Sequence, residues 1–445
     1  IRLVESLWSM LPLADWPGDE LDSVLKTLLL HQFHDIIPGS SIHAVYEDAD
    51  QAYAAAFATL ADLRERAARA LGITCNSPGC SPGGSTGGGT SATLVNGTNH
   101  GDGLTLFNCL SHVWRGTVVL PADCRATTLV DVAGREWPVQ QETGGPVALV
   151  ELPAQTLATF RFGQSGPAVA MPVGTDPILE NELVRYRFDR DGRLLEAWDK
   201  RFGRSILKVG ETGNRFSYYE DTPHDYEAWD IDFYYRDQLL ANATGMQWKR
   251  LPGGPVRQGL SFELAIGNSK ISQDVYLESG SAALSFHTRV DWHEERRMLR
   301  VGFPLNSLAQ EASCDIPYGF IKRPTPANTE WDFARFEVCA QRYVDISDAD
   351  YGVALLNDCK YGHALRDNVL DLCLLRSPMY PDPDADQGQH EFTYVLYPHG
   401  GDLIHSGVME AAAMLNRPPA VWSGAQGGGR SLPVRLDGDG VSMEV

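Results

Sequence analysis

One predicted helix ends and another begins within the stretch Leu28-Leu29-Leu30-His31-Gln32-Phe33-His34-Asp35-Ile36-Ile37-Pro38-Gly39-Ser40-Ser41-Ile42. Apolar residues in the range 21–29 recur at the spacing of a buried helix face, and Pro38-Gly39 breaks that pattern. His34 and Asp35 stand side by side on the connection. Such a pair can hold a metal ion or a sugar hydroxyl, but from the spacing alone the favoured interpretation is that it caps a helix end and the turn that follows.

The pattern around this stretch predicts three antiparallel helices over residues 1–72. Residues 1–10 already read as the middle of a helix. Asp19 or Asp22 is a candidate cap for the second helix, and Ser40 or Ser41 for the third, which Gly72 would end. We therefore expect a small three-helix bundle.

Beyond residue 72 the hydrophobic period changes from helical to alternating. Residues 73–92 are rich in Gly, Ser and Pro and predict a linker. Strand patterns without intervening amphipathic helices then favour antiparallel sheets. The predicted fold class is α+β multidomain: a three-helix bundle, a small β-sandwich over residues 93–166, and a large many-stranded sandwich over residues 167–445.

The composition excludes several classes of partner. The chain carries 37 Lys and Arg against 58 Asp and Glu, a net charge of −21, so it would repel nucleic acid and anionic membranes. No apolar run approaches the roughly 20 residues of a membrane span. The chain also contains no P-loop and no dinucleotide-binding glycine motif, so nucleotide chemistry has no support.

The eight cysteines favour a reducing cytoplasm. None forms a C-x-x-C pair, and most lie in apolar, strand-like runs, where a reduced thiol packs as a small hydrophobe. Cys75 and Cys80 lie close together in the linker. Their spacing allows either a disulfide within the loop or two free thiols, and two free thiols are favoured.

Two further clusters combine aromatic and polar residues. Residues 218–232 include Trp229 and Asp230 among many carboxylates, a composition typical of sugar sites, but an acidic loop anchored by a buried Trp229 is the plainer interpretation. Residues 356–363 follow an apolar strand and include Lys360, where an ordinary Asn/Asp turn explains the pattern almost as well.

The stretch from His31 to Ile42, with Val45-Tyr46 after it, closely resembles the middle-domain motif of glycoside hydrolase family 38 α-mannosidases. Further segments resemble the bacterial and vacuolar branch of that family in the same order along the chain. They are Ala228-Trp229-Asp230-Ile231-Asp232, Val290-Asp291-Trp292-His293-Glu294, Arg323-Pro324-Thr325, Asn328-Thr329, Trp331-Asp332, Phe336-Glu337-Val338, Leu355-Leu356-Asn357-Asp358-Cys359-Lys360-Tyr361-Gly362 and Leu375-Arg376-Ser377-Pro378.

The resemblance implies a zinc-dependent retaining hydrolase of terminal α-mannosides. Family members bind Zn²⁺ through two His and two Asp, and the bundle supplies one of those His, at the position of His34. Asp35 would contact sugar hydroxyls. Trp229 and Asp230 are candidates for reaching over the sugar, and Lys360 is a weaker one. His31 is expected to be structural rather than a ligand.

The resemblance also implies that important parts lie elsewhere. The family's other zinc ligands, its nucleophile and its acid/base belong to an N-terminal α/β barrel, and no position here matches them. We therefore expect the chain to be a piece of a longer protein, catalytically inactive alone and with little zinc affinity. The large sandwich would be a galactose-mutarotase-like supersandwich, truncated at its C-terminus.

The expected partners are an α-mannoside or oligomannose glycan and the protein's own barrel, and relatives are often dimers or larger. The alternative from another class is a non-catalytic carbohydrate-binding or scaffold protein, because the chain lacks a recognisable nucleophile. The sequence does not give the linkage preference.

Overall fold

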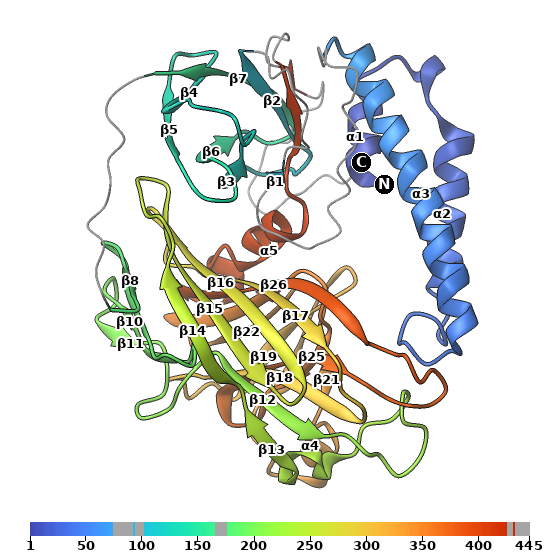
Figure 1. Cartoon of the computed structure of the whole chain (residues 1–445), viewed down its shortest axis with the longest axis vertical. Helices are drawn as coiled ribbons and strands as arrows, with labels where there is room; N and C mark the ends of the chain where they lie inside the picture. The colour runs from blue at the N-terminus through green and yellow to red at the C-terminus, as the bar shows by residue number, and fades with distance from the viewer. Residues whose placement is uncertain (74–91, 94–101, 165–175, 425–429, 432–445) are drawn as a thin grey trace.

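The protein is a β-rich, multidomain molecule with three helices along one side (Figure 1). The computed structural model describes residues 1–73, 92–93, 102–164, 176–424 and 430–431. Most of the predicted linker, with Cys75 and Cys80, lies outside the described residues. Within the described part, every helix is too short or too polar to cross a bilayer.

The N-terminal region contains the three predicted helices. They are α1 (Arg2–Trp8), α2 (Gly18–His31) and α3 (His43–Ala70), with a short 3-10 turn, η1 (Leu13–Asp15), between the first two. Both α1 and α2 pack on α3. Gly72 follows α3 with a φ of +80°, the left-handed conformation that favours glycine at a helix end.

The apolar face of α2 is buried only in part. Leu21 and Val24 are inside, but the side chains of Leu25 and Leu29 are 42% and 58% exposed, so the continuous buried stripe expected from the spacing ends midway along the helix. The buried part of the helical region lies near α1. There it shares one hydrophobic core with β-strand residues far along the chain, including Trp422.

The first β region includes a strand from the C-terminal end of the chain. Its sheet runs in the order β1 (Ala92–Thr93), β3 (Trp114–Val119), β6 (Val147–Leu152), β5 (Glu136–Gln140), β4 (Thr128–Asp131), β7 (Thr156–Gly163), β2 (Gly103–Asn108) and β27 (Ala420–Ser423), while β28 (Arg430–Ser431) pairs with β7. Strand β27 pairs antiparallel with β2, Leu104 facing Ser423 and Phe107 facing Ala420. The prediction that residues 167–445 form one separate sandwich is therefore wrong for residues 420–423.

The second β region contains three sheets. The four-stranded sheet has the order β11 (Arg204–Ser205), β10 (Leu194–Asp199), β9 (Val184–Phe188) and β8 (Ile178–Glu180). The six-stranded sheet has the order β13 (Leu239–Asn242), β12 (Arg215–Glu220), β18 (Arg297–Pro304), β25 (Val369–Arg376), β24 (Gly362–Ala364) and β21 (Val338–Cys339). The nine-stranded sheet has the order β14 (Thr244–Arg250), β15 (Arg257–Ile266), β16 (Ser269–Glu278), β17 (Leu284–Trp292), β26 (Gly388–Gly400), β23 (Tyr351–Asn357), β22 (Tyr343–Ser347), β19 (Glu311–Ile316) and β20 (Gly319–Pro324).

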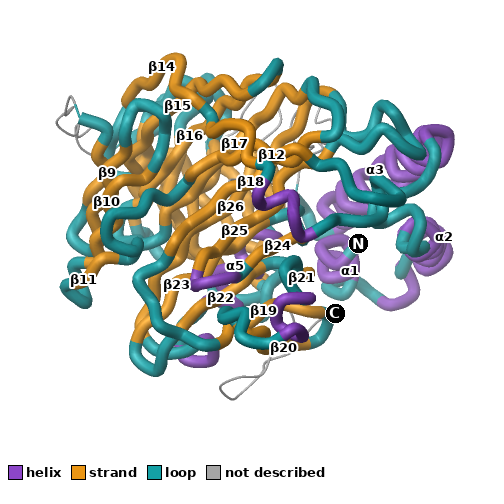
Figure 2. The backbone as a smooth tube through the Cα atoms, turned by 90° about the horizontal axis from the view of Figure 1, so that it is seen from below, coloured by secondary structure: helices purple, strands orange, loops and turns teal. Residues whose placement is uncertain are grey.

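One hydrophobic core joins these three sheets. Its buried residues come from all of them, for example Tyr186 from the four-stranded sheet, Val301 from the six-stranded sheet and Phe286 from the nine-stranded sheet. The inward side chains alternate along the strands, as an antiparallel sheet with one buried face requires. Figure 2 shows the strands stacked beside the helices α1, α2 and α3.

Short helices interrupt this region, contrary to the expectation of strands alone. They are η2 (Phe233–Asp237), α4 (Glu330–Ala334), η3 (Arg366–Asn368), η4 (Leu403–His405) and α5 (Val408–Asn416). Helix α5 packs on β22 and β23, and five of its nine residues are buried. Its Ala-rich sequence is apolar on several sides, so it carries little of the two-faced pattern by which a surface helix is recognised.

Trp422 offers a test of how the ends of the chain depend on each other. It is 2% exposed, packs in the core shared by α3 and β2, and donates its indole Nε1–H to Glu65 Oε1 at 3.2 Å. Trp422→Ala should lower the free energy of unfolding by about 3–5 kcal/mol, because it leaves a large cavity. Trp198→Ala, at a tryptophan that is 40% exposed, is the control and should cost about 1 kcal/mol or less in urea unfolding. Equal losses would contradict the shared core.

Candidate functional site

The turn between α2 and α3 presents His34 and Asp35 at its surface. After Gln32 the chain leaves the helix through a series of tight turns in which the amide of Ile37 donates to the carbonyl of Phe33 at 3.1 Å. The side chains of His34 and Asp35 are 70% and 47% exposed, and His34 Nε2 lies 3.6 Å from Asp35 Oδ1. An imidazole nitrogen and a carboxylate oxygen, which can bind a metal ion or a hydroxyl group, are therefore accessible at the surface of the turn.

The serines after the turn hold its backbone rather than capping α3. The Ser41 hydroxyl donates to the carbonyl of Asp35 at 2.6 Å, and the Ser40 hydroxyl does so at 3.4 Å. Helix α3 has Ile42 at its N-cap, without a side-chain cap, so the expectation of a serine cap is wrong. Gly39 has a φ of +81°, which a side chain would strain. These contacts fix the direction in which His34 and Asp35 point.

The fold brings Trp229 beside His34. The centroids of the two rings lie 6.2 Å apart with an interplanar angle of 85°, so the edge of one ring faces the other. The centroid of the His34 ring also lies 4.4 Å from that of the Phe33 ring. Trp229 is 53% exposed and does not anchor an acidic loop from the inside, so the plainer interpretation of this residue is wrong. An imidazole and an exposed indole from distant parts of the sequence share one surface.

Arg376 clamps the loop that carries Trp229. Its guanidinium donates to Asp221 Oδ2 at 2.6 Å and to the backbone carbonyls of Glu227 and Asp230 at 3.1 and 2.8 Å. The amides of Trp229 and Asp230 both donate to the carbonyl of Tyr226, closing a turn. Trp229 and Asp230 are thus held by their backbone, while their side chains remain at least partly accessible.

A second anchor of this loop is the Glu227 carboxylate. It accepts from Arg296 Nε at 2.9 Å and from the amide of Met379 at 2.8 Å. Burial would raise the pKa of Glu227, but these two hydrogen bonds outweigh it and the pKa is lowered, so the carboxylate stays charged. The loop is therefore tied to the end of β25 by Arg376 and to the segment after β25 by Met379.

The same segment also binds the helical region. Asp382 is 5% exposed, and its carboxylate lies 3.2 Å from Nδ1 of His43, the first residue of α3. Asp384 lies close by, and these three side chains form the one group of three potential metal ligands among the described residues. Around them is a cavity of about 410 Å³ lined also by Gly39 and Tyr46. The His43–Asp382 pair therefore sets the position of the turn against the large β region.

The remaining candidates from the sequence, His31 and Lys360, make contacts that do not involve His34 or Trp229. His31 is buried, donates from Nδ1 to the carbonyl of Thr27 at 2.7 Å and packs 4.8 Å from the ring of Tyr53, an arrangement of a structural residue. Lys360 Nζ lies 4.9 Å from the centroid of the Phe392 ring. Its neighbour Asp358 is partly buried, and the desolvation of its carboxyl raises the pKa of that group to about 6. The contacts seen for Lys360 do not join it to His34 or Trp229.

Sequence reasoning missed His43, Asp382 and the clamp at Arg376. His43 lies 339 residues from Asp382, and neither stands in a recognisable motif. Arg376 stands inside a quoted motif, but its partners are mainly backbone carbonyls, which no sequence pattern reveals. Only the preference of buried carboxylates for a partner would have hinted at these contacts.

Two protein-family models match this chain, and each contains one part of the candidate site. Residues 1–71 match the alpha mannosidase middle domain, and residues 179–384 match the glycosyl hydrolases family 38 C-terminal domain. The chain belongs to glycosyl hydrolase family 38. The turn with His34 comes from the first of the two matched domains and the loop with Trp229 from the second.

Relatives of this family 38 chain carry α-mannosidase names. It is 36% identical over 409 residues to Alpha-mannosidase 2C1 of Mus musculus and 30% identical over 419 residues to Alpha-mannosidase G of Dictyostelium discoideum. These alignments cover 91% and 89% of this chain but only 36% and 38% of the relatives. The chain thus spans little more than a third of the length of the relatives it matches.

The fold agrees with a solved structure of the family. The crystal structure of an α-mannosidase from Enterococcus faecalis V583 superposes with a TM-score of 0.73 at 18% identity, covering 97% of this chain and 57% of that one. At that identity the likeness shows the fold, including the order of the helical and β regions.

His43 and Asp382 predict a pH-dependent contribution to stability. The hydrogen bond to Asp382, followed by its charge, raises the pKa of His43 above the ordinary value of 6.5. This contribution is present below the unfolded pKa and is lost as the pH rises through the higher folded pKa. His43→Gln should therefore destabilise the protein in urea more at about pH 6 than at about pH 8.

The control is His405→Gln, at a histidine that is 78% exposed and pairs locally with Asp402. It leaves the contact between helix and β region intact and should not remove that pH dependence. A loss of stability from His43→Gln that is the same at both pH values would contradict a charged His43–Asp382 pair.

Proposed function

We propose that this chain is the bundle and β portion of a zinc-dependent, retaining α-mannosidase that hydrolyses terminal α-mannosides. The observation that carries the proposal is the meeting of His34, Asp35 and Trp229 at one surface, in a chain of family 38. Family membership favours the hydrolase over a non-catalytic carbohydrate-binding scaffold. In this proposal a barrel domain outside the chain supplies the nucleophile, the acid/base and the remaining metal ligands.

The residues at the turn fit a partial zinc site. Zinc prefers imidazole nitrogen and carboxylate oxygen in sets of four, or three with an open position. Here His34 is 70% exposed, so its Nε2 can reach a metal, and Asp35 lies 3.6 Å from it. A bound zinc would orient sugar hydroxyls and favour an oxocarbenium-like transition state. One histidine ligand is too few to hold the ion tightly, in keeping with a site completed by other residues, and Asp35 beside it is left to contact the sugar.

The neighbouring residues suit the recognition of a mannose ring. The exposed Trp229 indole offers an apolar face for the C–H groups of a pyranose, and Asp35 and Asp230 offer oxygens to its hydroxyls. The Arg376 clamp keeps the indole in place before the sugar binds, which reduces the entropy lost on binding. Lys360 stays a weaker candidate because its ammonium rests on Phe392.

Three finer points belong to the same proposal. The three sheets with their common core suit a galactose-mutarotase-like supersandwich. The six cysteines of the described residues are free thiols, which favours a reducing cytoplasm. The proposed substrate is an α-mannoside or an oligomannose glycan. The proposal does not depend on whether the chain forms a homo-oligomer.

His34 gives the sharpest test of this function. In a protein that joins the chain to its barrel, we expect zinc-dependent hydrolysis of an aryl α-mannoside. His34→Ala should lower kcat/KM by about 100-fold or more, beyond the effect typical of a residue that merely supports a ligand. Its zinc content, measured by atomic absorption, should fall together with the activity.

The matched control is His405→Ala, another exposed histidine beside a carboxylate. It should leave both activity and zinc content unchanged. Full activity in the His34→Ala protein would reject the metal role, and zinc binding without cleavage of any α-mannoside would reject the substrate.

Trp229 separates recognition of the sugar from the chemistry. In the same protein, Trp229→Ala should raise KM by about 3- to 10-fold, the equivalent of about 0.5–1.5 kcal/mol for an aromatic contact, with a smaller change in kcat. Trp229→Phe should recover part of the loss because it restores a ring. Unchanged kinetics for both variants would exclude contact between this side chain and the substrate.

A further inference from the structure

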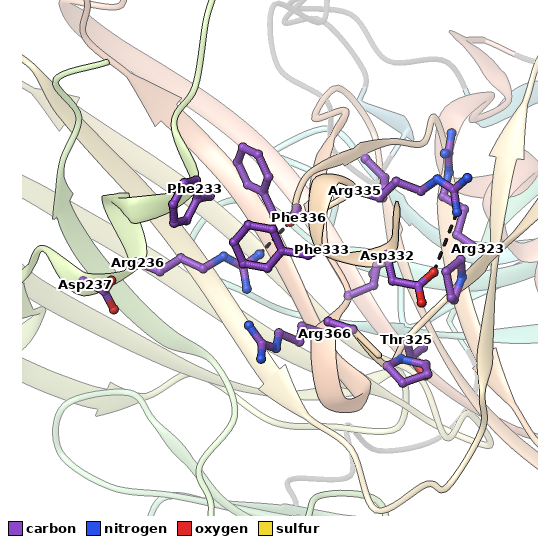
Figure 3. A pocket seen from close by; sticks show the side chains of 15 residues that line it. Phe233, Arg236, Asp237, Arg323, Thr325, Asp332, Phe333, Arg335, Phe336 and Arg366 are labelled. Carbon is purple, nitrogen blue, oxygen red and sulfur yellow. Dashed lines mark hydrogen bonds and ion pairs between the residues drawn. The ribbon is translucent and has the colours of Figure 1, made fainter. Parts of the chain in front are cut away.

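A cavity of about 190 Å³ lies between four segments of the second β region (Figure 3). It is lined by residues of η2, of α4 and the segment from α4 to the start of β21, of the end of β20 and the segment after it, and of the start of η3. None of the residues proposed above for zinc or mannoside lines it. Three quoted motifs, Arg323-Pro324-Thr325, Trp331-Asp332 and Phe336-Glu337-Val338, contribute to its wall, and the hydrolase proposal leaves them without a role.

The wall of this cavity is cationic in a strongly acidic protein. Its charged residues are Arg236, Arg323, Arg335, Arg366, Asp237 and Asp332, four guanidinium groups against two carboxylates. The chain as a whole carries a net charge of −21. Four arginines lining one small space favour an anion, since a guanidinium group can offer a planar fork of N–H donors to oxygen atoms.

The arginines have spare hydrogen-bonding capacity. Arg335 and Arg366 are half exposed, and their nearest carboxylates lie 3.9 and 3.6 Å away, too far for a good hydrogen bond. Arg236 donates from Nη2 to the carbonyl of Phe336 at 2.6 Å. Yet among the described residues three arginine Nε atoms are buried without a hydrogen-bond partner, and two of them, in Arg236 and Arg323, belong to this cavity.

Aromatic rings flank the guanidinium groups. The rings of Phe233 and Phe333 lie 5.0 Å apart at 67°, and the ring of Phe336 lies 6.3 Å from Phe233. Phe233 and Phe333 are 48% and 43% exposed. Figure 3 shows the three rings grouped near Arg236, with Asp332 and Arg335 to one side. A ligand that fits this wall has an anionic group for the arginines and an apolar face for the rings.

We propose that this cavity binds a phosphate monoester of a hexose, with the phosphate among the arginines and the sugar ring against Phe233 and Phe333. A phosphate provides several acceptor oxygens for guanidinium donors, and the C–H face of a hexose packs on aromatic rings. The cavity volume suits a small ligand of this size. This binding is separate from mannoside hydrolysis, so it holds or fails independently of that function.

The test is calorimetric titration of the 445-residue chain with mannose 6-phosphate, inorganic phosphate and mannose. Mannose 6-phosphate should bind at least tenfold more tightly than inorganic phosphate, and mannose should not bind measurably. The double variant Arg335→Gln/Arg366→Gln should weaken binding of mannose 6-phosphate by tenfold or more. Both side chains are about half exposed, so their loss should leave the unfolding midpoint unchanged.

Arg289→Gln is the matched control, because this arginine is similarly exposed, at 58%, on β17 and does not line the cavity. It should bind mannose 6-phosphate as the native chain does. Absence of binding to both phosphates, or equal binding by the double variant, would overturn the proposal. Equal affinity for inorganic phosphate and mannose 6-phosphate would overturn the proposed role of the rings. If Arg289→Gln weakened the binding of mannose 6-phosphate as much as the double variant does, net charge alone would explain the loss and the arginine site would be rejected.

Discussion

The arrangement of the candidate site depends on a buried carboxylate, that of Asp382. A charge that is 5% exposed needs a partner, since the loss of hydration is otherwise uncompensated. Asp382 obtains the imidazole of His43 at 3.2 Å and the amide of Asp384 at 3.0 Å. Because His43 is the first residue of α3, satisfying Asp382 also fixes where the preceding turn lies against the β region.

The segment that carries Asp382 also controls the other half of the site. Arg376, at the end of β25, holds the backbone of the Trp229 loop, and the amide of Met379 binds Glu227 in the same loop. One short connection between β25 and β26 thus positions a histidine from one matched domain and a tryptophan from the other. The 6.2 Å separation of the His34 and Trp229 rings also rests on contacts made by other residues, namely Arg376, Met379 and Asp382. This explains how two exposed side chains hold a defined arrangement without packing tightly on each other.

Sequence patterns predicted the local elements better than their partners. The helical spacing gave α1, α2 and α3, and alternation gave long strands such as β16 and β17, because both depend on the immediate neighbours of each residue. The pairing of β27 with β2 escaped prediction, since it joins residues more than 300 positions apart by backbone hydrogen bonds. His34 drew attention through its motif, whereas the position of Trp229 beside it required the folded chain. The exposed half of α2 shows the same limit, because spacing reveals an apolar face without revealing what covers it.

The two environments of arginine in this protein show why the cationic cavity differs from ordinary structural pairing. Arg300 is 1% exposed and is matched by Asp371 at 2.7 Å and Glu337 at 3.2 Å, so its burial is compensated within the chain. Arg236 lies 3.6 Å from the same Glu337, which is already engaged by Arg300 and by the hydroxyl of Tyr235. Its Nε remains buried and without a partner at the wall of a cavity. The fold thus pairs the buried Arg300 with two carboxylates but leaves the Nε–H donor of Arg236 without a partner at the cavity wall. Since an unsatisfied buried donor costs free energy, this arrangement is better suited to binding an anion in the cavity than to stabilising the fold.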